Sequence, residues 1–214
     1  MMALFYKGIP DYYLRKFIAV RDPFDNLENI LNLAEIINNC SHTRLLGFDK
    51  NSEIVLFTGD YSRILIKKQD GYFSMALPFQ VVDYGLQIAF NLELFEKGID
   101  SEFISIMRNA INFTKNSKIS HEDMLVDLVV NFNLDTSDAI SYLDAFFHLA
   151  SEDHGYFRFD DDPKNQDGNL HPRYHFDFFC KNSTTVKIGK DTHADIDCFY
   201  SLFDAAWAKW YLRK

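Results

Sequence analysis

The sequence predicts an α+β fold in which a largely antiparallel sheet packs with several helices. Apolar residues recur at helical spacing over about the first 40 residues, and short β-branched and aromatic runs with turn residues between them follow. The same alternation then repeats, helical from 80 to 150 and strand-like from 156 to 188. With 47% hydrophobic residues in 214, one domain spanning 1–214 is the simplest expectation, and a two-lobe arrangement divided near residue 80 or 118 stays open.

The N-terminal part predicts two helices, 10–20 and 25–40. Asp25 or Asn26 can cap the second, because short polar side chains accept hydrogen bonds from the first free backbone N–H groups of a helix. Four short strands are expected next, forming an antiparallel meander over residues 43–48, 53–58, 62–68 and 72–77. Asp70-Gly71 lies between the last two, and this dipeptide is typical of a hairpin turn.

The segment from 80 to 150 predicts three helices. One follows Ser101, and a second begins at Ser120, which is spaced from Asp123 as in a capping box. Asp135 or Thr136 begins the third. The remaining chain predicts a second group of strands and a long closing helix, over residues 156–160, 173–180, 184–188 and about 194–212.

The charge of −9 is concentrated in the middle of the chain. Residues 81–170 carry 6 Lys and Arg against 17 Asp and Glu, whereas residues 1–80 carry 9 against 9 and residues 171–214 carry 7 against 5. Such a field repels phosphate backbones, so non-specific nucleic-acid binding is disfavoured and a basic protein is the natural partner. Ordinary solvated acidic helices are the plainer interpretation.

Three cysteines without a CxxC spacing, Cys40, Cys180 and Cys198, indicate reduced thiols rather than a disulfide framework. No secretion signal and no long apolar segment stand out, so we expect a cytoplasmic protein without a membrane segment. No Walker motif, dinucleotide fingerprint or nucleophile elbow is present, and no cofactor is expected.

The most informative part is a polar constellation near the C-terminus. Side chains alternate across a strand, so Arg158 and Asp160 share one face of the first strand while Phe157 and Phe159 take the other. The second run repeats this pattern, with polar side chains on one face at His171, Arg173, His175 and Asp177. If the strands pair with their aromatic faces toward the core, six ionisable side chains gather on one surface, and Lys187 of the next strand can flank them.

Three interpretations of this constellation remain open. A metal site requires converging ligands, and His175 with Asp177 is suitable if Asp160 or His154 joins them. His171 and His175 would be about 13 Å apart in a regular strand and cannot then share one ion. Metal-independent phosphodiester hydrolysis would use the two histidines as general acid and base and the cations for the phosphorane charge, as in a small ribonuclease. A solvent-facing surface with cross-strand ion pairs is the third.

The block from Arg158-Phe159-Asp160 to His171-Pro172-Arg173-Tyr174-His175 resembles one in an uncharacterised family of bacterial proteins. Members of that family have an Arg-x-Asp strand, an acidic loop, His-Pro-x-x-His and a closing helix. The resemblance covers about 50 of the 214 residues and implies no activity, because a shared block does not assign a function. Proteins of this size and character are frequent in bacterial defence islands and toxin–immunity loci, which is an association and not a mechanism.

These observations predict a binding protein, either an accessory subunit or an immunity-type neutraliser in a defence or toxin-related system. The competing hypothesis is a phosphodiester hydrolase that uses His171 and His175 with Arg158, Arg173 and Asp177. The sequence does not decide whether the protein is an enzyme or a binding protein. It does not determine the oligomeric state either.

Overall fold

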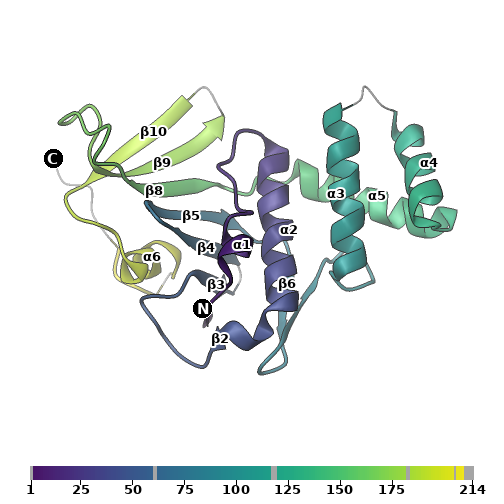
Figure 1. Ribbon diagram of the computed structural model, residues 1–214, viewed down its shortest axis with the longest axis horizontal. Coiled ribbons are helices and arrows are strands. Elements are labelled where there is room, and N and C mark those ends of the chain that lie inside the picture. Colours follow the sequence, from purple (N-terminus) through teal and green to yellow (C-terminus); the bar gives the residue numbers. More distant parts are fainter. Residues whose placement is uncertain (1, 60–61, 117–119, 182–183, 205, 210–214) are drawn as a thin grey trace. The chain divides into compact units, whose positions relative to one another are not determined.

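The computed structural model describes residues 2–59, 62–116, 120–181, 184–204 and 206–209, with only the backbone described at 179–181, 184 and 185. It confirms the α+β class, with six α-helices among the described residues and strands that all pair antiparallel (Figure 1). The chain forms two compact units. Unit 1 comprises residues 1–8, 43–77 and 154–214, and unit 2 comprises 9–42 and 78–153. The expectation of a single domain stays a prediction.

Unit 1 contains an eight-stranded sheet in the order β10-β9-β8-β5-β4-β3-β1-β2. Its strands are β1 (Met2–Tyr6), β2 (Arg44–Leu45), β3 (Ile54–Thr58), β4 (Arg63–Lys68), β5 (Gly71–Ala76), β8 (Phe157–Asp161), β9 (Tyr174–Lys181) and β10 (Thr184–Lys190). The two strand groups expected from the sequence therefore join in one sheet, through the antiparallel pairing of β5 with β8.

Gly71 makes the junction between β5 and β8 possible. Its φ is +149°, and a Cβ at this position would lie 1.9 Å from the carbonyl oxygen of Phe159. Only glycine allows so close an approach of two backbones. The expected Asp70-Gly71 turn is thus also the point at which the C-terminal strands attach.

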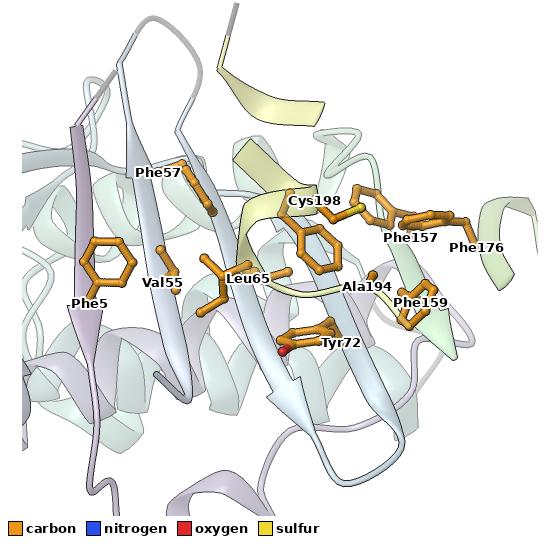
Figure 2. Close-up of a cluster of buried hydrophobic side chains, with 12 residues drawn as sticks. Phe5, Val55, Phe57, Leu65, Tyr72, Phe157, Phe159, Phe176, Ala194 and Cys198 are labelled. Atoms are coloured by element: carbon orange, nitrogen blue, oxygen red, sulfur yellow. The ribbon is translucent and has the colours of Figure 1, made fainter. Parts of the chain in front are cut away.

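One face of the sheet is covered by aromatic side chains and α6 (Ile196–Phe203). Figure 2 shows Phe157, Phe159 and Phe176 on the same side of the sheet as Cys198 of α6. The ring centroids of Phe159 and Phe176 are 5.1 Å apart, a separation typical of favourable aromatic pairs. The expectation that the aromatic faces of the C-terminal strands point into the core is confirmed.

The closing helix is shorter than the expected 194–212, and residues 205 and 210–212 of that span lie outside the described residues. It ends at Phe203, because Asp204 has an extended backbone and its side chain accepts a hydrogen bond from the backbone of Ala206. Lys209 donates to the carbonyls of Ser201 and Asp204, which turns the following chain back onto the helix end. Apolar spacing alone did not reveal this termination.

Unit 2 is mainly helical. It contains α1 (Asp11–Leu14), α2 (Pro23–Asn39), β6 (Gln80–Asp83), β7 (Ile88–Asn91), α3 (Ser101–Asn116), α4 (His121–Phe132) and α5 (Thr136–Ser151), while a 3-10 turn, Ser41–Thr43, lies at a boundary between the units. The capping box of Ser120 and Asp123 and the N-cap Asp135 are confirmed.

Three expectations for unit 2 are wrong. Helix α2 begins earlier than expected, because Asp22 caps it, Pro23 occupies the first turn and Asp25 reciprocates as the third residue. The segment 80–91 forms a two-stranded hairpin instead of helix. The expected first helix, 10–20, is helical only from Asp11 to Leu14.

Candidate functional site

The polar residues of β8, β9 and β10 meet on the face of the sheet opposite the aromatic core. The strand register places Arg158 directly opposite Asp177, and Asp177 opposite Lys187. Asp160 is opposite His175. These five residues, Arg158, Asp160, His175, Asp177 and Lys187, are called the polar cluster below. The sequence predicted their common face from alternation alone.

Asp177 is the anionic centre of the polar cluster. Its side chain has no exposed surface, and its two oxygens lie 2.6 Å from Lys187 Nζ and 2.9 Å from a terminal nitrogen of Arg158. Burial raises the pKa of this carboxyl, but hydrogen bonds and charges from Lys187 and Arg158 outweigh burial and lower the pKa below its ordinary value. Asp177 is therefore an ionised carboxylate held by two cations.

Asp160 lies in a different electrostatic setting. Its Oδ2 is 2.7 Å from Arg158 Nε and 3.7 Å from His175 Nε2. Burial raises the pKa of Asp160, and the neighbouring Asp177 adds to this effect against the opposing charge of Arg158. Of the two carboxyls in the polar cluster, Asp160 is the one that accepts a proton more readily.

His175 is only 1% exposed and both of its ring nitrogens have partners. Nδ1 lies 2.8 Å from the carbonyl oxygen of Pro172, which can only accept a hydrogen bond, so Nδ1 carries a proton. Nε2 lies 2.9 Å from Lys187 Nζ, an ammonium that can only donate. The neutral Nδ1–H tautomer satisfies both contacts and directs the Nε2 lone pair into the polar cluster.

A close backbone approach holds Pro172 in place. Gly189 of β10 is opposite His175 in the register, and a Cβ on Gly189 would lie 2.9 Å from Cγ of Pro172. A side chain at this position would displace the proline ring. The absence of a side chain at residue 189 therefore allows the carbonyl of Pro172 to reach the imidazole.

His171 precedes β9 and does not belong to a regular strand. It forms an isolated bridge with Asp167, and its ring centroid lies 4.8 Å from that of His175. The separation of about 13 Å applies to two histidines in one regular strand, and His171 lies outside β9, before a bend at Arg173. His171 Nε2 is 3.4 Å from Asp162 Oδ2 without forming a hydrogen bond, so His171 lies beside the polar cluster rather than within it.

Arg173 was expected on the same face but lies apart from the polar cluster. Its Nε is 2.8 Å from Asp161 Oδ1, and its guanidinium stacks over the ring of Tyr174. The start of β9 at Tyr174 explains the difference, since residue 173 lies before the regular alternation. Sequence reasoning also missed the roles of Asp161, Asp162 and Gly189, which depend on contacts with Arg173, His171 and Pro172 in the folded chain.

Among the described residues, one group of ligand-type side chains converges, namely Asp160, His175 and Asp177, and each offers an atom within 4.8 Å of the others. His154 is not among them. His175 is buried, and its two ring nitrogens face the carbonyl of Pro172 and the ammonium of Lys187. The hydrolase hypothesis stays a prediction.

Unit 2 provides a second candidate surface. It carries 18 Asp and Glu against 7 Lys and Arg, a formal charge of −11, whereas unit 1 carries 13 against 15, a formal charge of +2. Lys16, Arg108 and Lys115 already form ion pairs with carboxylates of α2. These cations do not offset the acidic residues of α4.

Helix α4 has apolar residues on two sides. Met124 and Leu128 are buried, whereas Val126 and Val130 are 60% and 71% exposed. The exposed valines are one helical turn apart, so they adjoin each other on the surface. The acidic residues spaced three or four positions from a valine on this surface are Glu122, Asp123 and Asp127. Together with the two valines they form what is called the α4 surface below.

None of the helices described in the structure combines the length and the apolar character that a bilayer-spanning segment requires. Cys40 and Cys198 are buried and form no disulfide among the described residues, and the side chain of Cys180 lies outside the described residues. Comparison of the chain with protein-family models, with curated proteins and with solved structures finds no match.

Proposed function

We propose that the protein is a non-catalytic binding protein that captures a basic protein partner through the α4 surface. In this proposal it serves as an accessory or immunity-type component of a bacterial defence or toxin-related system. The observation that carries the proposal is the pair of exposed valines, Val126 and Val130, within an acidic helical unit.

The charge of unit 2 selects the kind of partner. A formal charge of −11 attracts a basic surface over long range and raises the rate of encounter. The same charge repels a second copy of the chain and repels nucleic acid. Proteins that act on nucleic acids carry basic surfaces, so a nucleic-acid-directed toxin or defence protein has the required charge.

The valines supply what charge alone does not. Stable interfaces have an apolar, fully buried centre and a polar rim, and the α4 surface has this arrangement on a small scale. A helix that is apolar on two sides usually has both sides covered. Helix α4 packs against α3 and α5 through its other side (Figure 1), so the valines are the side that remains for a partner.

The size and acidic character of the chain support the biological setting, since such proteins are frequent in bacterial defence islands and toxin–immunity loci. This support is by association, and the α4 surface does not depend on it. The polar cluster of unit 1 also fits a binding protein, because its carboxylates and its imidazole are held by ion pairs and hydrogen bonds within the cluster and to the carbonyl of Pro172.

A defined peptide tests the proposal. The probe is a fluorescein-labelled amphipathic helix with Leu at three- and four-residue spacing and Lys at the other positions, and the control probe has Glu in place of Lys. Fluorescence anisotropy should show salt-dependent binding of the Lys peptide to the full-length protein and none of the Glu peptide.

Replacing Val126 and Val130 by Gln together leaves the charge unchanged. Loss of two apolar contacts of about 1 kcal/mol each should weaken binding about thirtyfold. The matched control is Val186→Gln on β10, a valine of unit 1 that is 53% exposed and whose replacement should not affect binding. Equal binding by the double variant and the wild-type protein would overturn the proposal.

A further inference from the structure

We infer that Asp160, His175 and Asp177 form a binding site for a divalent transition-metal ion, with Zn²⁺ as the preferred ion. The site lies in unit 1 and is independent of the α4 surface, so either proposal can fail while the other stands.

The positions of the ligand atoms fit one ion. His175 Nε2 is 3.7 Å from Asp160 Oδ2 and 3.7 Å from Asp177 Oδ2, and all three residues offer atoms within 4.8 Å of one another. An ion at the centre of such a triangle would lie about 2.1–2.8 Å from each atom, and the lower end matches zinc–nitrogen and zinc–carboxylate bonds. Small side-chain rotations therefore complete the coordination.

The surroundings prepare each ligand. A metal-binding histidine usually donates its other N–H to a carbonyl or carboxylate, and His175 donates Nδ1–H to Pro172. This bond fixes the tautomer in which Nε2 has a free lone pair for a cation. Arg158 contacts Asp160 Oδ2 and Asp177 Oδ2, which holds the two carboxylates on either side of one point.

A cation already occupies this place. Lys187 Nζ lies 2.6 Å from Asp177 Oδ1 and 2.9 Å from His175 Nε2, so the imidazole lone pair and a carboxylate both face an ammonium. The Lys187 side chain is 27% exposed and can turn toward water when an ion enters. In metal binding the divalent ion therefore replaces the ammonium of Lys187, and no covalent bond of the protein changes.

The ligand types select the ion. One imidazole and two carboxylates favour Zn²⁺ and Co²⁺ over Mg²⁺ and Ca²⁺, which prefer sets made only of oxygen atoms. Three protein ligands leave a fourth tetrahedral position for water.

The test is a metal titration of the chelator-treated full-length protein. We expect one Zn²⁺ per chain, measured by competition with a chromophoric zinc indicator, and a visible absorption band of tetrahedral Co²⁺ that Zn²⁺ abolishes. The key variant is Lys187→Met, which removes the competing ammonium and should raise the Zn²⁺ affinity about tenfold or more, since a unit charge within a few ångströms of the ion opposes binding. A gain of affinity cannot result from misfolding.

Two matched controls complete the test. Lys190→Met removes a lysine of the same strand whose ammonium contacts Thr192 instead, and the Zn²⁺ affinity should stay unchanged. His175→Asn should lose the Co²⁺ band, whereas His171→Asn should keep it. Absence of Zn²⁺ binding by the wild-type protein overturns the proposal, even if Lys187→Met binds. Binding that neither Lys187→Met nor His175→Asn changes overturns it as well.

Discussion

Replacing Asp177 by Asn is the strongest perturbation of the polar cluster. The carboxylate has no exposed surface and lies 2.6 Å from Lys187 Nζ and 2.9 Å from Arg158. Removing one member of a buried ion pair costs about 3–5 kcal/mol. Lys187 and Arg158 are 27% and 29% exposed and recover some hydration, so we expect a loss of about 2–4 kcal/mol in the free energy of unfolding.

Urea denaturation followed by tryptophan fluorescence measures this loss, because both tryptophans, Trp207 and Trp210, belong to unit 1. With a denaturant slope of about 2–3 kcal/mol per molar urea, the midpoint should fall by about 1 M. The matched variant is Asp160→Asn, which removes a carboxylate from the same site. Since the pKa of Asp160 is raised, its ionised form is disfavoured by folding, and this variant should change stability by less than about 1 kcal/mol.

The pH dependence separates the two carboxyls further. The pKa of Asp177 is lowered by folding, so its contribution is present above the unfolded value of 3.8 and is lost as the pH falls through the folded pKa. The stability difference between the wild-type protein and Asp177→Asn should be constant from about pH 5 to 8 and shrink below about pH 4. Equal stability of Asp177→Asn and the wild-type protein at pH 7 would refute the assignment of Asp177 as the ionised centre.

Three further predictions concern the surroundings of the polar cluster. Gly189→Ala should destabilise the protein by about 1–2 kcal/mol in urea denaturation, because the new methyl group displaces Pro172 from His175; an unchanged midpoint would contradict the packing described. Arg173→Ala should leave the urea midpoint unchanged within error, since the ion pair of Arg173 with Asp161 lies outside the polar cluster. A large fall in the midpoint would show that Arg173 contributes to the polar cluster after all. Burial raises the pKa of Cys198 to about 11, so this thiol should react with a disulfide reagent at pH 8 only after denaturation, and rapid reaction of the native protein at Cys198 would disagree.

The sequence was sufficient where local rules determine the structure. The caps of α4 and α5 follow from Ser120 and Asp135, whose side chains act within one helical turn. The polar cluster follows from strand alternation, because Phe157 and Phe159 must point into the core and Arg158 and Asp160 therefore cannot.

Features that depend on contacts between residues far apart in the sequence could not be predicted from the sequence. A bend at Arg173 separates His171 from β9, and the rings of His171 and His175 lie 4.8 Å apart. The ring of Pro172 lies against Gly189, which the sheet register pairs with His175. The early end of α6 depends on Lys209, which donates back to carbonyls of the helix end. Neither contact produces a pattern of apolar and polar residues that can be recognised in the sequence.

Photo-cross-linking tests the proposed binding function most directly. A benzophenone amino acid placed at Val130 in cells that produce the full-length protein should form an adduct with one basic protein, and the same group at Val186 should not. Added salt should weaken this contact, as expected for an acidic surface facing a basic one. Equal adducts from both positions, or an adduct only with another copy of the chain, would contradict the assignment of the α4 surface as the site that binds a basic partner.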